Sequence, residues 1–111
     1  MDEWCAPEAC SLPIADQPGR VAEWDALFRT AVREIEAVPG GVRFGLDRSR
    51  ADVAGVADLA DRESQCCAFF TFGVTVATDA LALSVDADPE HAEVVAALAA
   101  RAVRLSGTPA P

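Results

Sequence analysis

The sequence predicts a small α+β domain, two layers thick, in which helices cover one face of a three-stranded, mainly antiparallel sheet. Two observations predict this class. Three segments carry apolar residues at steps of three and four, as amphipathic helices do. Three other segments alternate apolar with polar residues, as strands with one buried face do. The segments follow in the order α-β-α-β-β-α, and 111 residues, 51% of them hydrophobic, suffice for one domain with one core.

The first helix is expected from about Asp16 to Val38. Pro18 suits its first turn, and the turn-forming residues 39–41 end it. Its apolar stripe consists of Trp24, Leu27, Phe28, Ala31, Ile35 and Val38. Residues 1–15 before the helix are expected to form an irregular segment that contains two cysteines.

The second helix is expected after a short half-buried strand at residues 42–46. Ser49 and Asp52 resemble a capping box, with Asp in the place usually held by Glu, and are expected to open this helix. Its apolar stripe continues through Glu63 and Cys67. A carboxylate and a thiol on an apolar stripe are unusual, so both are candidates for a functional site.

Two further strands, at residues 70–76 and 81–85, are expected to form a hairpin. Because a helix joins the first strand to the second, these two are predicted to run parallel through a right-handed crossover. The third strand is predicted to lie between them, as in a split β-α-β unit. One apolar face on each strand places all helices on a single side of the sheet.

The last helix is expected to begin at Asp88-Pro89-Glu90, which supplies a cap, a proline in the first turn and an acid near the positive end of the helix. Ser106-Gly107 is expected to stop it. The predicted domain therefore covers residues 16–106, with a frayed tail at 107–111. His91, the single histidine, is expected to be a surface residue in the first turn of this helix.

The composition narrows the classes of function. Nine arginines and no lysine stand against eighteen acidic residues, which gives a net charge of −9. A surface this negative repels nucleic-acid phosphates and anionic lipids, so direct binding to nucleic acid or membrane is not expected. No long apolar run and no secretory signal are visible, so we expect a cytoplasmic protein. The absence of Lys, Asn and Tyr is typical of a GC-rich bacterial genome.

The four cysteines, Cys5, Cys10, Cys66 and Cys67, are the chemically distinctive residues of the chain. Without a secretory signal, we expect them to be reduced thiols. Adjacent cysteines form only a strained eight-membered disulfide ring, which makes Cys66-Cys67 a poor structural staple. The spacings C-x4-C and CC also differ from the paired C-x-x-C of structural zinc sites.

The pair Cys66-Cys67 is expected where the second helix meets the second strand, so that one thiol faces the core and the other a cleft. Glu63 lies three and four residues earlier and shares a helical face with either thiol. Arg62, four residues before Cys66, would favour a thiolate there, whereas Glu63 would oppose it. The sequence does not show which of these two opposing effects on the Cys66 thiol is the larger.

Thiolates prefer soft or borderline ions, namely Hg(II), As(III), Cu(I) and Zn(II). If the N-terminal segment packs near the second helix, Cys10 completes a three-thiol metal site with Cys66 and Cys67, and Glu63 lies behind these ligands. Structural roles remain open beside this one. Cys67 equally fits core packing, Glu63 equally fits a hydrogen-bonded structural carboxylate, and Cys5 is expected to be incidental.

A resemblance to a known family adds to this reading. The motif E-x-x-C-C-x-F-F marks a family of small, largely uncharacterised bacterial proteins, and this chain resembles it through Cys10, Glu63, Cys66, Cys67, Phe69 and Phe70. Related segments are associated with metal-responsive regulators of the mercury-sensing class. The resemblance covers residues from about 10 to 98. This sequence departs from the family at Ala68, where proline is common, and at Cys5, which has no match.

The resemblance implies heavy-metal handling by three thiols and one acid, namely Cys10, Cys66, Cys67 and Glu63. Because no DNA-binding helix pair is expected in this chain, it would be an accessory protein, with a regulator protein as a candidate partner. Two other classes stay open, a thiol redox module and a plain interaction domain with structural cysteines. Enzymatic activity is left open and not favoured, and a soft metal ion is the one cofactor considered.

Overall fold

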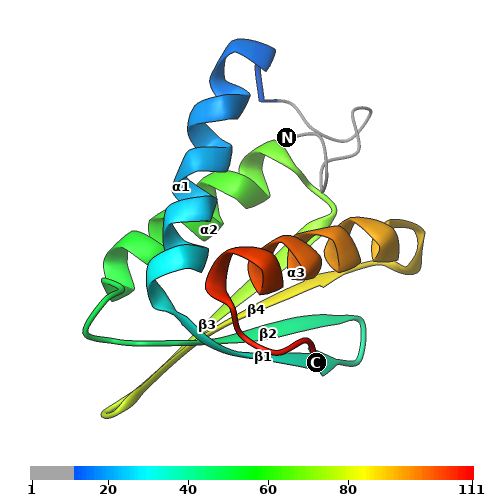
Figure 1. The fold of residues 1–111 in the computed structure, drawn as a ribbon. Helices are drawn as coiled ribbons and strands as arrows, with labels where there is room; N and C mark the ends of the chain where they lie inside the picture. The colour runs from blue at the N-terminus through cyan, green and yellow to red at the C-terminus, as the bar shows by residue number, and fades with distance from the viewer. Residues whose placement is uncertain (1–11) are drawn as a thin grey trace.

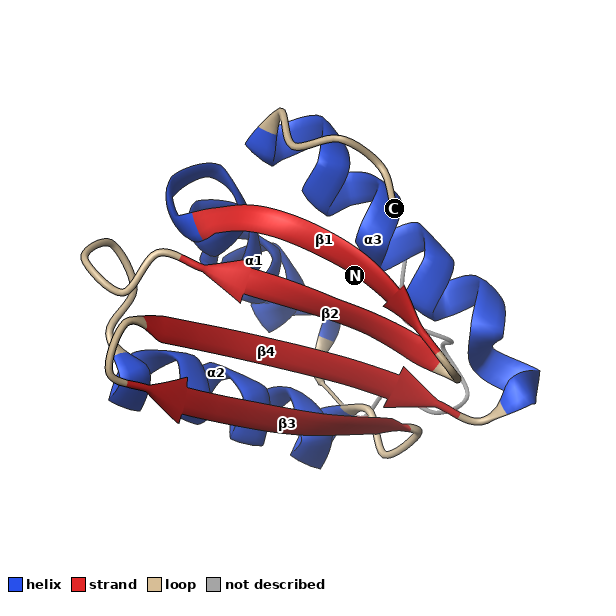
Figure 2. Cartoon of the chain, turned by 90° about the horizontal axis from the view of Figure 1, so that it is seen from below, coloured by secondary structure: helices blue, strands red, loops and turns tan. Residues whose placement is uncertain are grey.

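The structure, a computed structural model, describes residues 12–111 except for the side chain of Ile14. It has two layers, a four-stranded sheet and three α-helices on one of its faces (Figure 2). The predicted α+β class and the one-sided packing of the helices are therefore confirmed. The predicted number of strands is wrong, because the sheet has a fourth strand.

Within residues 12–111, α-helices and strands follow one another in this order (Figure 1): α1 (Gln17–Ala31), β1 (Val32–Val38), β2 (Gly41–Leu46), α2 (Val53–Cys66), β3 (Phe70–Ala77), β4 (Ala80–Ala87) and α3 (Ala92–Ser106). Short 3-10 helices precede α1 at Ile14–Asp16 and α3 at Pro89–His91. None of the helices within residues 12–111 combines the length and the apolar character that a bilayer span requires.

The strand order in the sheet is β1-β2-β4-β3, and every neighbouring pair is antiparallel. Since β4 pairs with both β2 and β3, these two strands run parallel to each other with β4 between them. This is the split β-α-β arrangement predicted for the three strands that the sequence pattern revealed. The helix α2 makes the crossover and packs on β3, while α1 and α3 pack against each other.

The first helix ends at Ala31, so the prediction that it continues to Val38 is wrong. Residues 32–38 form β1, in which Val32 and Ile35 are both buried. A register shift between Val32 and Glu34 marks a bulge in the pairing of β1 with β2. A bulge inserts an extra residue, so two residues three apart face the same side. This spacing imitates the period of a helix and explains the error.

The hairpin between β1 and β2 turns at Pro39-Gly40. Gly40 has φ +80°, a value that L side chains rarely adopt, and a proline before such a glycine is typical of a type II turn. The predicted stop of the helix at residues 39–41 is therefore a hairpin turn. A run of β-branched residues before this turn, Val32, Ile35 and Val38, is the sequence signal that favours a strand.

The ends of the other helices follow the expected local chemistry. The side chain of Asp52 accepts a hydrogen bond from the Gly55 amide at 3.0 Å and caps α2. Ser49, predicted as the first residue of a capping box, instead donates to Asp47 and lies in the preceding loop. As predicted, α3 ends at Ser106, where Gly107 has φ +72°, the left-handed C-cap that glycine favours.

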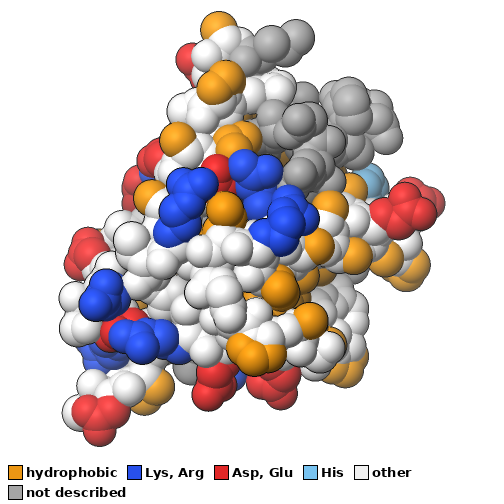
Figure 3. Space-filling model, in the orientation of Figure 1, with side chains coloured by type: hydrophobic (Ala, Val, Ile, Leu, Met, Phe, Trp, Pro, Cys, Tyr) orange, Lys and Arg blue, Asp and Glu red, His pale blue; other side chains and the backbone are white. Residues whose placement is uncertain are grey.

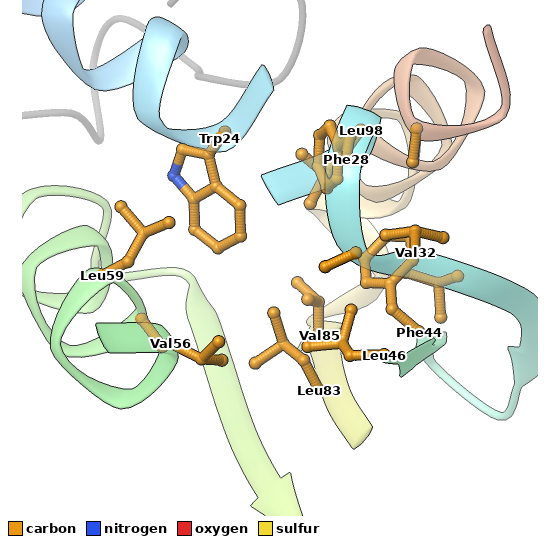
Figure 4. Close-up of a cluster of buried hydrophobic side chains, with 14 of the residues drawn as sticks. Trp24, Phe28, Val32, Phe44, Leu46, Val56, Leu59, Leu83, Val85 and Leu98 are labelled. Atoms are coloured by element: carbon orange, nitrogen blue, oxygen red, sulfur yellow. The ribbon is translucent and has the colours of Figure 1, made fainter. Parts of the chain in front are cut away.

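The hydrophobic core fills the space between the sheet and the helices (Figure 4). Its central side chains are almost completely buried and come from every layer, namely Trp24, Phe28, Phe44, Leu83, Val85 and Leu98. The Phe28 ring lies 5.5 Å from the Phe44 ring and so joins α1 to β2. Burial of this apolar area supplies most of the folding free energy.

An ion pair links α1 to α3 on the face shown in Figure 3, where basic side chains gather over these helices. Arg101 donates two hydrogen bonds to the carboxylate of Asp25, at 2.7 and 2.8 Å. These bonds hold the pKa of Asp25 below its ordinary value, against the opposing effect of burial. A bidentate pair of this kind fixes the relative position of two helices.

Candidate functional site

Glu63 lies in the last turn of α2 and is a completely buried carboxylate, with 0% of its surface exposed. Its Oε1 accepts a hydrogen bond of 2.8 Å from Trp24 Nε1 and lies 3.3 Å from Arg20 Nη1. Its Oε2 accepts a hydrogen bond of 3.2 Å from the Cys67 thiol. Both oxygens are therefore bonded. We call Arg20, Trp24, Glu63, Cys66 and Cys67 the Glu63 cluster.

Two helices build this cluster from short segments. Arg20 and Trp24 are four residues apart on α1, and Glu63 and Cys67 are four apart at the end of α2, so each pair shares a helical face. The amide of Cys67 donates to the Glu63 carbonyl at 2.8 Å and closes the helix. The chain then leaves the helical conformation at Cys67, where φ is −123° and ψ is 85°.

The two neighbouring thiols have different surroundings, as the sequence predicted for this helix end. Cys67 is fully buried in the core beside Glu63, whereas Cys66 is partly exposed. Within residues 12–111 neither sulfur takes part in a disulfide. One thiol therefore belongs to the packed interior, and the other is reachable from solvent.

A buried guanidinium lies next to the partly exposed thiol. Arg20 Nη1 is 3.9 Å from Cys66 Sγ, and the Arg20 side chain is only 9% exposed. The same nitrogen contacts Glu63, while Arg20 Nε lies 3.6 Å from Glu23. A positive charge is thus held between the buried carboxylate and the outer thiol.

Arg62, which the sequence placed beside Cys66, has other partners. Its Nη1 and Nη2 bond the carboxylate of Glu23 at 2.9 and 2.7 Å, and its Nε bonds Asp58 at 2.9 Å. The hydrogen bonds from Arg62 lower the pKa of Glu23, and these carboxylates raise the pKa of Arg62. The cation next to the thiol is therefore Arg20, 46 residues away in the sequence.

Within the Glu63 cluster, the positive charge of Arg20 and the negative charge of Glu63 compensate each other. Arg20 and Glu63 form a buried ion pair, and such a pair is tolerated only when further hydrogen bonds satisfy its remaining polar atoms. Trp24 and Cys67 supply these bonds to Glu63. Removal of Arg20 would leave the Glu63 charge without a cation in the core, whereas removal of Glu63 would leave Arg20 with only the more exposed Glu23 as its partner.

Aromatic packing fixes the indole that donates to Glu63. The Trp24 ring stacks on Phe72 of β3, with centroids 5.9 Å apart and an angle of 21° between the planes. Phe72 contacts Phe70 at 5.4 Å, and Phe70 is itself in the core. Phe70 and Phe72 therefore support the position of Trp24.

His91 is less exposed than expected, since 18% of its side chain is accessible. Its ring stacks on Phe69 with centroids 4.2 Å apart, and its Nδ1 lies 2.7 Å from Asp88. Asp88, Glu90 and His91 can bring one ligand atom each within 4.8 Å of one another. Both carboxylates are exposed, and the 3-10 turn alone accounts for their proximity, so this group is not the candidate site.

The predicted third thiol lies outside the described residues. Cys10 and Cys5 both fall within residues 1–11. The meeting of Cys10 with Cys66 and Cys67 therefore stays a prediction. The structure does bring together the other predicted site residues, because Glu63 contacts Cys67 directly and reaches the neighbourhood of Cys66 through Arg20.

Sequence reasoning missed Arg20 and Trp24 as site residues. A signal for Arg20 was present, since the buried stripe of α1 runs through Arg20, Trp24, Phe28 and Ala31. A charged residue at a stripe position needs a buried partner. Glu63, the acid at a stripe position of the second helix, is that partner.

Comparison of the chain with known protein families, curated proteins and solved structures finds no match.

Proposed function

We propose that this protein binds one soft metal or metalloid ion, such as Hg(II), As(III), Cu(I) or Zn(II), through the thiolates of Cys66 and Cys67. Cys10 is the third ligand in this proposal, and Glu63 holds Cys67 from behind. The observation that carries the proposal is the adjacent pair of thiols beside a buried Arg20–Glu63 ion pair.

The surroundings of each sulfur support this role. Metal ligation requires the thiolate form, and the guanidinium 3.9 Å from Cys66 Sγ offers the positive charge that stabilises an anion there. In the metal-free protein the Cys67 thiol donates a hydrogen bond to Glu63 Oε2. When Cys67 binds the ion as a thiolate, this carboxylate is the acceptor placed to take up the thiol proton. Hydrogen-bonded carboxylates behind the ligands are common in metal sites.

Charge balance also supports binding of a cation here. Arg20 and Glu63 already compensate each other, so the two thiolates are the charges left to match an incoming ion. Two thiolates neutralise a divalent ion such as Hg(II), and a third from Cys10 would neutralise As(III). A neutral product avoids the large cost of an unmatched charge in a mostly buried site.

In the cell, we place this protein in the cytoplasm as an accessory protein for heavy-metal handling, without catalytic activity. The resemblance to E-x-x-C-C-x-F-F proteins supports this placement and makes a metal-responsive regulator the candidate protein partner. The net charge of −9 disfavours direct binding to nucleic acid and to anionic membranes.

The test is an anaerobic titration of the reduced protein with Hg(II), As(III), Zn(II) and Cu(I), followed by thiolate–metal absorbance and native mass spectrometry. We expect one equivalent of a soft ion to stay bound in competition with a free dithiol. Cys66→Ser and Cys67→Ser should each lose this binding, and Cys10→Ser should weaken it. Cys5→Ser is the matched control and should bind as the wild type does.

Two results would overturn the proposal. The first is affinity no greater than that of the competing dithiol, and the second is unchanged binding in Cys66→Ser. A disulfide that forms quantitatively with mild oxidant, in a protein that binds no ion, would instead assign the cysteines to a thiol redox module.

A further inference from the structure

The two edges of the sheet differ in the protection that they carry against pairing with another strand. The edge strands are β1 and β3. An exposed edge offers backbone N–H and C=O groups to any extended chain, and proteins guard such edges with charges, prolines, bulges or a cover. An edge strand without such protection is therefore a candidate for pairing with a strand of another chain.

The β1 edge carries several of these protections. It has a bulge near Val32, and its residues Arg33, Glu34 and Glu36 are charged and exposed. The helix α3 packs against β1, and the hydroxyl of Thr108 contacts the Val32 carbonyl at 3.5 Å. A second chain cannot easily extend the sheet from this side.

Among the described residues, the β3 strand itself carries no charge, proline or bulge, although α2 packs on one of its faces and Arg48 donates to the carbonyls of Ala77 and Thr78 at its end. All eight residues of β3, Phe70–Ala77, are uncharged, and none is proline. Its pairing with β4 is regular from end to end. Among residues 12–111, Val76 is the large apolar side chain that is exposed, at 49%, and it lies on this strand. In an antiparallel ladder, alternate residues of such a strand direct their N–H and C=O groups outward.

We propose that two copies of this chain associate through β3, which pairs antiparallel with β3 of the other copy and joins the two sheets into one. This inference does not depend on the proposed metal site. It assigns an interaction surface, and the partner it fits is a second copy of the chain.

The side chains of β3 are self-complementary for such a pairing. Phe70, Phe72, Val74 and Val76 face the helices, because they lie opposite core residues of β4, and the threonines face the other side. A two-fold axis at Gly73 sets each phenylalanine opposite a valine and each Thr71 opposite a Thr75. Aromatic–aliphatic and Thr–Thr pairs across strands are favourable, and a two-fold interface uses the same patch on both copies.

A groove beside the edge offers room for the partner's apolar side chains. It lies between α2 and β3 and has a volume of about 390 Å³. The helix lines it with the small residues Ala57, Ala60 and Ser64 and with the acid Asp61, and the strand lines it with Phe70, Thr71, Phe72 and Val74. Half-buried valines and phenylalanines of a paired β3 would pack beside this groove. The apolar side of the added strand would then be covered by α2 of both copies.

The area available meets the requirement of a specific dimer. The eight residues of β3 extend about 27 Å along the edge of the sheet. The combined thickness of the sheet and of α2 packed on it gives this side of the molecule a height of about 20 Å. Two such strips bury about 1,100 Å² in total, slightly above the roughly 1,000 Å² expected of a specific interface. Two chains of net charge −9 repel each other, and β3 itself adds no charge to the contact, whereas Asp61 on the α2 side of the groove adds one negative charge from each copy.

The test uses the full reduced chain in sedimentation equilibrium over a wide range of concentrations. We expect the mass to rise from one chain to two. Val76→Lys places an inward-pointing charge on the edge, at a side chain that is half exposed in the single chain, so the fold should tolerate it. In the dimer this charge would lie against a phenylalanine of the other copy, and association should weaken by about tenfold or more.

The matched control is Ala80→Lys, which adds the same charge at an exposed position of β4, away from the edge. It should associate as the wild type does. Hydrogen exchange should show amides of β3 that become protected as concentration rises, while those of β1 do not change. A wild-type protein that stays a single chain at every concentration overturns the proposal, even if β3 accepts a strand from another protein. Equal association of Val76→Lys and Ala80→Lys overturns it as well.

Discussion

The indole nitrogen of Trp24 and the carboxylate of Glu63 are joined by a buried hydrogen bond of 2.8 Å, although the two residues are 39 positions apart in the sequence. This bond links α1 to α2 directly above β3, where Trp24 stacks on Phe72. It therefore connects the position of the carboxylate, and through it the Cys67 thiol, to the packing of the two helices.

Trp24→Phe keeps an aromatic ring in the core but removes the N–H donor. We expect it to lower the free energy of unfolding by about 1–3 kcal/mol, because it leaves an acceptor of Glu63 less satisfied in a dry site. Urea unfolding measures this change. A double-mutant cycle with Glu63→Leu, which has no acceptor, separates the lost hydrogen bond from the lost volume. The absence of coupling between the two changes would contradict the role assigned to the bond.

Glu63→Leu removes one charge of the buried ion pair and leaves Arg20 with only the partly exposed Glu23 as its partner. A loss of about 3–5 kcal/mol is expected, as for other broken buried pairs. The double variant Arg20→Met/Glu63→Leu removes both charges and should recover a large part of this loss. Thermal and urea unfolding of the two single variants and the double variant test this. If the double variant loses as much as the sum of the single ones, the two side chains do not act as a pair.

Cys66→Ser and Cys67→Ser should separate stability from ligand binding. Cys67 is 0% exposed and contacts Glu63, so its replacement should cost about 1–3 kcal/mol. Cys66 is partly exposed, and its replacement should change stability by less than about 1 kcal/mol. Both variants should nevertheless lose the soft ion. A stable Cys66→Ser that binds the ion as the wild type does would overturn the proposed site.

The sequence pattern predicted those parts of the fold in which local and tertiary signals agree. The alternation in β2, β3 and β4 identified three strands, and the crossover rule placed β4 between the other two. In β1 the signals conflict, since a bulge sets Val32 and Ile35 three residues apart on the buried side. Periodicity alone cannot separate this pattern from a helix, and only β-branching and the turn after Val38 distinguish them.

Only the contacts of the candidate site that form within one helix could be predicted from the sequence. Glu63 and Cys67 lie four residues apart on α2, so their contact follows from helical spacing. The contacts of Arg20 and Trp24 depend on how α1 crosses α2, and no local pattern contains this angle. Arg62 was the nearest arginine in sequence, but its side chain reaches Glu23 and Asp58 on the helix surface.

The contacts of Asp47, in the loop after β2, predict that the free energy of unfolding falls at acid pH. The hydroxyl and the amide of Ser49 donate to Asp47, with Arg33 as a further partner, and these contacts lower the pKa of Asp47 from 3.8 to about 2. Because the folded value lies below the unfolded one, the stabilising contribution is fully present above pH 3.8. It is lost as the pH falls towards 2.

Asp47→Asn lacks this contribution at every pH. The stability difference between wild type and Asp47→Asn should therefore be constant near neutral pH and shrink between about pH 4 and pH 2. Urea unfolding at a series of pH values measures it. A difference that stays constant down to pH 2 would show that the carboxylate is not selectively stabilised in the folded protein.

The close approach of β2 and β4 at Gly41, the first residue of β2, leads to a prediction about this glycine. A Cβ at Gly41 would lie 2.0 Å from the Val85 carbonyl oxygen and 2.4 Å from Asp86 Oδ1, so the backbones of β2 and β4 would have to separate. We expect Gly41→Ala to lower the free energy of unfolding by about 2 kcal/mol or more, as overpacking and a disturbed strand pair do.

Gly19→Ala is the matched control, because nothing lies within 4 Å of a Cβ at that position in the first turns of α1. Alanine is the better helix former, so this variant should be unchanged or more stable by up to about 1 kcal/mol. Urea unfolding of both variants tests the contrast. If Gly41→Ala is as stable as the wild type, β2 and β4 do not approach as closely at Gly41 as the register Gly41–Asp86 requires.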